Sequence, residues 1–261
     1  MALDGFTDFE FADDGAVRTV YRRGSGPAVV VMHEIPGITP EVAGFARRVA
    51  DAGFTVWLPH LFGTAGRPLS MAYAATQIAR ACVAREFAVL AKDASSPITD
   101  WLRALARRAH AECGGPGVGA LGMCLTGNFA LALVLDAPVV APVLSQPSLP
   151  FGLTSSHRAA VHASPDEIAA VKRLVADGGT VLGLRFTADP MCPAERFATL
   201  RRELGDGFEA VEIDSAPGNP WKIPRSAHSV LTTDLVDAEG HPTRVALDRV
   251  LALFRSRLHA A

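Results

Sequence analysis

The stretch Val118-Gly-Ala-Leu-Gly-Met-Cys-Leu-Thr-Gly127 decides how the chain is expected to fold. Its first six residues are apolar or small and predict a buried strand, and the apolar residues from Leu125 to Leu135 predict a helix that follows with almost no loop. Cys124 stands at the turn between them. A thiol at this turn projects beyond the carboxyl end of a strand, which is where open α/β sheets keep their ligands.

The segments on either side of this turn alternate between strand and helix patterns. Residues 6–23 alternate around Asp13-Asp14-Gly15, which predicts an antiparallel hairpin. Further strands are expected at 28–32, 55–58, 118–123, 139–144, 180–186 and 208–213, and helices at 40–53, within 70–113, and at 125–135, 193–204 and 243–258. This order predicts an α/β fold with a doubly wound, mostly parallel sheet. Because no linker interrupts residues 1–261, we expect a single domain.

Charge and composition limit the classes of partner. Charged residues make up 20% of the chain and the formal net charge is −2, so no basic surface for nucleic acid or an anionic membrane is indicated. The most apolar stretch, residues 129–144, contains one aspartate and two prolines, which excludes a membrane span of roughly 20 apolar residues. The first ten residues carry three acidic side chains where a secretory signal needs a basic start. We expect a cytoplasmic protein with a small-molecule partner.

The cysteines indicate neither a metal site nor a redox pair. Four cysteines stand at positions 82, 113, 124 and 192, without the paired spacing of a zinc knuckle or a redox dithiol. In a reducing compartment we expect free thiols. Burial as small hydrophobic residues is the ordinary interpretation for all of them except Cys124. We expect no metal and no cofactor.

The turn at Cys124 resembles a nucleophile elbow, in which small residues flank a strained nucleophile. Gly122 fits the position two before it, but the position two after it is Thr126, with the glycine displaced to Gly127. The start of the following helix would favour a thiolate there. No G-x-S-x-G motif offers a serine a comparable position. The alternative is a buried structural cysteine.

An acid and a base follow in the order that α/β-hydrolases use. Asp189 comes directly after a predicted strand, and His228 lies in the loop after the next one. Such an aspartate can hold an imidazole by its Nδ1–H and stabilise its charged form. Asp189 could instead cap a helix, and Asp214 is a weaker rival for the acid. The sequence predicts a triad of Cys124, His228 and Asp189.

The turn His33-Glu34-Ile35-Pro36-Gly37 follows the first parallel strand, where an oxyanion hole is expected. A tetrahedral intermediate needs two N–H donors aimed at its oxygen. We assign them to the backbone N–H groups of Ile35 and Leu125. Pro36 cannot donate.

These motifs together resemble the dienelactone hydrolase family. The resemblance rests on Glu34-Ile-x-Gly37, Ala52-Gly53-Phe54, Leu58-Pro59-x-Leu61, Gly122-x-Cys124-Leu125 and Ala227-His228-Ser229, spread over most of the chain. It implies an α/β-hydrolase fold and cleavage of a small ester or lactone through a covalent acyl-enzyme. It also implies that Glu34 accepts the proton of the Cys124 thiol; the alternative for Glu34 is a solvated loop carboxylate.

Two departures from the family pattern bear on the substrate. His60 replaces an aspartate, and Thr232 replaces the arginine that family members use against a substrate carboxylate. Arg225, Arg80 or Arg85 could substitute for that arginine, although each is ordinarily a surface residue. Two other functions stay open: a non-catalytic homologue that binds a small ligand, which Thr126 and His60 favour, and a thioesterase or acyl transferase that uses the same triad.

Overall fold

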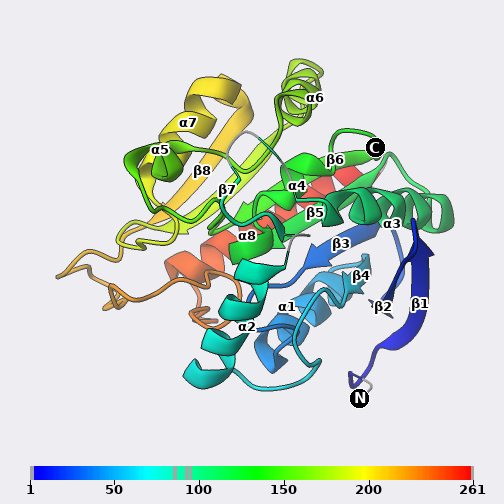
Figure 1. Cartoon of the computed structure of the whole chain (residues 1–261), viewed down its shortest axis with the longest axis horizontal. Helices are drawn as coiled ribbons and strands as arrows, with labels where there is room; N and C mark the ends of the chain where they lie inside the picture. The colour runs from blue at the N-terminus through cyan, green and yellow to red at the C-terminus, as the bar shows by residue number, and fades with distance from the viewer. Residues whose placement is uncertain (1–2, 85–86, 92–93, 95, 260–261) are drawn as a thin grey trace.

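The computed structural model describes residues 3–84, 87–91, 94 and 96–259. In this part of the chain eight strands form one sheet in the order β1-β2-β4-β3-β5-β6-β7-β8 (Figure 1). The strands are Thr7–Asp13 (β1), Ala16–Arg23 (β2), Ala28–Met32 (β3), Thr55–Pro59 (β4), Val118–Met123 (β5), Val139–Ser145 (β6), Val181–Phe186 (β7) and Phe208–Ile213 (β8). The β1–β2 hairpin joins β4 antiparallel, and all other neighbours pair parallel. The predicted sheet with its antiparallel opening is confirmed.

Helices cover both faces of this sheet. They are Pro40–Asp51 (α1), Met71–Val83 (α2), Ile98–Cys113 (α3), Phe129–Ala132 (α4), Ser155–Ala159 (α5), Pro165–Ala176 (α6), Ala194–Leu204 (α7) and Pro242–Leu258 (α8). Val29 and Val31 of β3 pack in one apolar cluster with α1 and α8, whereas Val30 and Met32 pack in another with α3 and α4. Successive residues of a strand point to opposite faces, so this fully buried strand supports a core on each side.

The helix that we predicted over residues 125–135 is wrong in length. The chain forms a 3-10 turn at Cys124–Thr126 and then only the short helix α4. After α4 the backbone bonds join residues three apart, Val134 N–H to Leu131 and Leu135 N–H to Ala132, which is 3-10 geometry. The apolar residues 129–133 are buried, but burial here does not require a long helix.

One helix was missed although its sequence signal is clear. We expected no helix between the strands at 139–144 and 180–186, but α6 lies there, over Pro165–Ala176. Ser164 caps it with a complete capping box, in which its hydroxyl accepts the Glu167 N–H while the Glu167 carboxylate accepts the Ser164 N–H. Proline at the first helical position completes the start.

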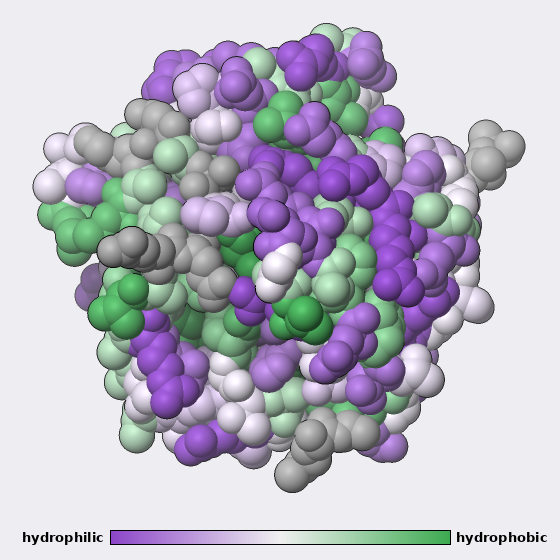
Figure 2. Space-filling view, turned by 45° about the vertical axis from the view of Figure 1, so that its right-hand side comes forward, coloured by the Kyte–Doolittle hydropathy of each residue, from purple (hydrophilic) through white to green (hydrophobic). Residues whose placement is uncertain are grey.

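The face of the molecule drawn in Figure 2 is mixed in polarity. In Figure 2 hydrophobic side chains form separate small groups among hydrophilic ones. Within the described residues, no helix has the length and hydrophobicity needed to cross a bilayer.

The sheet order brings two functional loops together. The chain runs from β3 to β4 on one side and later returns to β5 on the other side of β3, so the connections leave in opposite directions at this point. The ladder between β3 and β5 ends at the pair Met32 and Gly122. The loop with Glu34 and the turn with Cys124 therefore start side by side at the carboxyl edge, the position at which such sheets bind ligands.

Candidate active site

Cys124 occupies a turn that only a few side chains tolerate. Its φ is +53°, in the left-handed region that residues other than glycine rarely adopt. A Cβ on Gly122 would lie 2.1 Å from the Thr126 carbonyl oxygen, and one on Gly127 would lie 2.5 Å from Pro147 Cα. The two glycines therefore allow the close approaches that fix the turn. Gly127 is still required for packing although it stands one residue later than the elbow pattern places it.

His228 and Asp189 are brought together from loops that follow β8 and β7. His228 Nδ1 lies 2.7 Å from Asp189 Oδ2, and Asp189 Oδ1 accepts the Met191 N–H at 2.9 Å. The backbone N–H groups of His228 and Ser229 both donate to Asp234 Oδ2, at 2.8 and 2.9 Å. These bonds fix the imidazole loop, and Asp234 is a residue that sequence reasoning missed.

Cys124 lies close enough to the His228 imidazole to influence its pKa. Burial lowers the pKa of His228, but the charge of Cys124 and the hydrogen bond and charge of Asp189 outweigh it, so the pKa stands well above 6.5. His228 Nε2 is buried and has no hydrogen bond of ordinary geometry to the described residues. Cys124 is itself 4% exposed.

The rival groups are engaged elsewhere. Asp214 is exposed and its carboxylate accepts the Ala216 N–H of its own turn at 2.9 Å. His33 Nε2 accepts the Leu61 N–H at 3.0 Å, and burial lowers the pKa of His33 to about 3, so this ring is neutral. Burial likewise lowers the pKa of His162 to about 4.

Glu34 is a buried carboxyl surrounded by neutral donors. It is 4% exposed, and it accepts hydrogen bonds from Ser229 Oγ at 2.7 Å, from Gln146 Nε2 at 3.1 Å and from the Thr232 hydroxyl. Burial raises the pKa of Glu34, although these donors and nearby His228 act in the opposite direction. The expectation of a possible solvated loop carboxylate does not fit this burial. A carboxyl with a raised pKa is able to take up a proton.

The two backbone groups that we assigned to an oxyanion hole belong to the adjacent loops. Leu125 is the second residue of the turn that carries Cys124. The Ile35 N–H donates no hydrogen bond to the described residues, and the following Pro36 has no N–H to offer. A free donor beside a nucleophile is what an oxyanion requires.

The surroundings of Cys124 are apolar. It shares a cluster with Leu61, Phe87, Val89 and Leu149, and the partly buried side chains of Ile35, Phe62 and Phe151 pack against that cluster. Phe62 and Phe87 meet edge to face, with ring centroids 5.5 Å apart. Cys124 therefore belongs to an apolar part of the core.

The roles of the arginines that we considered as substitutes stay predictions. Arg225 and Arg80 are exposed, and no contact links either of them to the residues around Cys124 in the described part of the chain. Arg85 lies outside the described residues. Thr232 directs its hydroxyl to Glu34 instead of towards a substrate charge.

Gln146 is a site residue that sequence reasoning missed. It is fully buried directly after β6, with φ at +36°, and it joins the Glu34 carboxyl to the imidazole loop through a long contact of 3.4 Å from the Val230 N–H to its Oε1. The signal that could have found it is its place at the carboxyl end of a strand next to β5.

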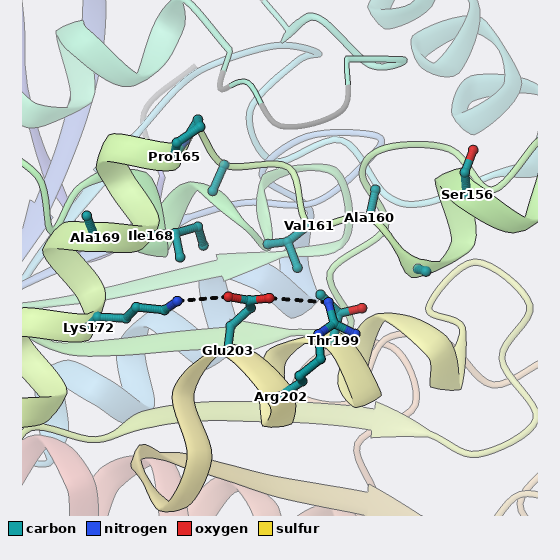
Figure 3. Close-up of a pocket in the computed structure, with 12 residues that line it drawn as sticks. Ser156, Ala160, Val161, Pro165, Ile168, Ala169, Lys172, Thr199, Arg202 and Glu203 are labelled. Atoms are coloured by element: carbon teal, nitrogen blue, oxygen red, sulfur yellow. Dashed lines mark hydrogen bonds and ion pairs between the residues drawn. The ribbon is translucent and has the colours of Figure 1, made fainter.

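Other parts of the described structure offer no competing centre. Among these residues no group of three or more histidine, cysteine, aspartate or glutamate side chains could hold a metal. A cavity of about 620 Å³ lies between α5, α6 and α7, where Lys172 and Arg202 both pair with Glu203 (Figure 3). Its lining includes none of the residues gathered at Cys124.

Comparison with known proteins gives one family and one fold. A model of the dienelactone hydrolase family matches residues 16–221. A candidate dienelactone hydrolase from Klebsiella pneumoniae subsp. pneumoniae aligns with a TM-score of 0.63 and 18% identity, over 96% of this chain and 99% of that chain. A dienelactone hydrolase-like promiscuous phosphotriesterase from metagenomic libraries aligns with a TM-score of 0.59 and 17% identity, over 97% of this chain and 98% of that chain. A cold-adapted esterase from an Arctic intertidal metagenomic library aligns with a TM-score of 0.53 and 14% identity, over 99% of this chain and 97% of that chain. Curated proteins gave no match.

Proposed function

The chain belongs to the dienelactone hydrolase family of α/β-hydrolases, and from this premise we propose that it hydrolyses a small neutral ester or lactone through a covalent acyl group on Cys124. One observation carries the proposal: the His228 Nδ1 lies 2.7 Å from Asp189, and the buried Cys124 is close enough to the same ring to influence its pKa. Nucleophile, base and orienting acid in this order are the arrangement of acyl-transfer enzymes.

In the first half of the reaction, Glu34 accepts the thiol proton while His228 is an imidazolium. The Cys124 thiolate attacks the carbonyl carbon, and the N–H groups of Ile35 and Leu125 hold the resulting oxyanion. As the carbonyl re-forms, the bond to the leaving oxygen breaks, and that oxygen takes the proton of His228. An alcohol, or the free hydroxyl end of an opened lactone, results, and the acyl group stays on sulfur.

In the second half, neutral His228 removes a proton from water, which attacks the thioester carbon. The tetrahedral intermediate expels the thiolate, and Glu34 returns its proton to sulfur. The carboxylic acid leaves, and the enzyme regains its thiol, its glutamate and its imidazolium. The raised pKa of Glu34 supports its use as a temporary proton store.

The neutrality of the substrate is proposed from the partners of Glu34 and the lining of the site. Thr232 offers a hydroxyl where the family pattern has an arginine, and apolar side chains such as Phe62 and Phe151 pack against the core cluster that contains Cys124. A carboxylate would lose its hydration there without gaining a charged partner.

The proposal is tested by trapping the acyl group. The protein is mixed with panels of small esters, lactones and thioesters, quenched in acid, and the peptide with Cys124 is weighed by mass spectrometry. We expect the acyl mass on Cys124 and no turnover in Cys124→Ala, while Cys82→Ala, which removes an exposed thiol of α2, keeps full activity.

The same panel separates the alternatives. Turnover of thioesters alone would indicate a thioesterase or acyl transferase. Binding of these compounds without an adduct or turnover would indicate a non-catalytic homologue and contradict the proposal. Ester hydrolysis that survives in Cys124→Ala would contradict the assigned nucleophile.

A further inference from the structure

Thr126 is the residue that departs from the elbow pattern, and its side chain has a specific use. From its contacts we infer that Thr126 is a positioning residue. Its hydroxyl sets the distance between the two N–H groups of the oxyanion hole, those of Ile35 and Leu125. The inference rests on the proposed function, since it assigns Thr126 a role in holding the oxyanion formed at Cys124.

The hydroxyl lies between two loops that belong to different strands. Thr126 is fully buried, and its Oγ1 accepts the N–H of Met123, the last residue of β5, at 3.0 Å. The same oxygen lies 3.0 Å from the Met32 carbonyl oxygen and 3.2 Å from that of His33, at the end of β3, and 3.0 Å from that of Met123. A hydroxyl has one proton, so it donates to one of these oxygens at a time.

This contact continues the β3–β5 connection past the point where the ladder stops. The last ladder pair is Met32 and Gly122. Beyond it, β3 leads to Ile35 and β5 leads to Leu125, the two residues whose N–H groups are assigned to the oxyanion. Among the described contacts, the hydroxyl of Thr126 joins these two diverging segments directly. A glycine or alanine at position 126 would have no atom there.

The chemistry of the hydroxyl predicts which substitutions matter. Thr126→Val keeps the shape but leaves the buried Met123 N–H and the β3 carbonyl oxygens without this partner, so the two loops lose their connection. Thr126→Ser keeps the hydroxyl and removes only a methyl group. A role in space filling would rank valine above serine, whereas a role in positioning ranks serine above valine.

The experiment compares two reactions of the same sulfur. Hydrolysis of a neutral ester passes through an oxyanion, but alkylation of Cys124 by iodoacetamide displaces iodide and forms none. Thr126→Val is expected to lower kcat by about tenfold or more, since loss of one oxyanion donor typically costs about 10²–10³-fold, with little change in KM. Its alkylation rate should stay within about twofold of the wild type, and Thr126→Ser should restore most of kcat.

Thr55→Val is the matched control. Thr55 is also a buried threonine, and its hydroxyl donates at 2.7 Å to the Gly26 carbonyl, but it stands at the first residue of β4, at the other end of the sheet. It should lower the midpoint of thermal unfolding without lowering kcat relative to alkylation.

The outcomes separate this inference from the proposed function. Thr126→Val with wild-type kcat, or with kcat and alkylation lowered together as in a loosened fold, overturns the inference and leaves the triad untouched. If the valine variant does not fold, Thr126→Ser provides the test: its kcat must stay within about threefold of the wild-type value, and a larger loss overturns the inference. A wild-type protein that turns over no ester overturns the proposed function, and the inference with it.

Discussion

Replacement of Glu34 by glutamine distinguishes the proposed proton route from a simple Cys-His pair. The glutamine can be accommodated, because its oxygen can accept from Ser229 and Gln146 while its NH₂ group donates to the Thr232 hydroxyl, which is able to turn and accept. We therefore expect a folded variant, with the free energy of unfolding lowered by about 1 kcal/mol at most at neutral pH.

The expected loss is in catalysis. Removal of a general base commonly lowers the rate about 10²–10⁴-fold, which corresponds to about 3–5 kcal/mol of transition-state stabilisation. The measurement is kcat and KM for a neutral ester, together with the rate of Cys124 acylation in a single turnover. Glu239→Gln, at an exposed position, is the control and should leave kcat unchanged. If Glu34→Gln lowers kcat less than about tenfold, His228 alone activates the sulfur and the reasoning is refuted.

The same variant has a signature in the pH dependence of stability. Because the pKa of Glu34 is raised above 4.5 by folding, the native state binds the proton more tightly than the unfolded state. The corresponding stability is fully present below pH 4.5 and is lost as the pH rises through the raised pKa. Glutamine does not titrate. The unfolding free energy of Glu34→Gln, relative to the wild type, should therefore rise with pH above 4.5, as measured by urea denaturation.

Three further predictions concern the substrate, the imidazole and the elbow. For a lactone or ester that carries a free carboxylate group, methylation of that group should raise kcat/KM by roughly one to two decades. Thr232→Arg should make this difference in kcat/KM smaller. A preference of the wild type for the free carboxylate would mean that another cation binds it. Cys124→Ala should lower the pKa of His228 in an NMR titration if the resting sulfur is charged, because the charge of Cys124 is the largest influence that raises it; an unchanged pKa would show that the resting sulfur carries no charge near the ring. Gly122→Ala should lower the free energy of unfolding by about 1–3 kcal/mol, because its Cβ would lie 2.1 Å from a carbonyl oxygen. Gly44→Ala in α1 has open space and should leave that free energy unchanged or raise it by up to about 1 kcal/mol. Equal changes for the two variants in denaturant-unfolding measurements would contradict this account of the turn.

The order of strands and helices was predictable because each element carries its own local pattern. The hairpin around Asp13-Asp14-Gly15, the β3–α1–β4 unit and the strand before Cys124 were all confirmed. The helix α6 was equally readable from its capping box at Ser164 and was overlooked. The short α4 was not readable, because the choice between α and 3-10 bonding in a fully buried apolar segment depends on its packing.

The candidate site likewise contains residues that the sequence could indicate and one that it could not. Cys124, Asp189, His228 and Glu34 follow strand ends, and the topology of a parallel sheet brings such positions together. Their assigned roles stay predictions. Gln146 could not be given a partner from the sequence, because its contact with Glu34 joins residues 112 positions apart and depends on how two loops fold over the sheet edge.

The three donors to Glu34 differ in what they can do when that carboxyl becomes an acid. The Gln146 amide can only donate through its NH₂ group, but the hydroxyls of Ser229 and Thr232 are rotors that can reverse from donor to acceptor. An arginine at 232 would have five N–H groups and no acceptor, and its charge would oppose the neutral form. In the proposed mechanism, Thr232 can therefore accept a hydrogen bond from Glu34 when that carboxyl is protonated. The same residue that offers no charge to a substrate carboxylate thus also makes the neutral form of Glu34 easier to accommodate.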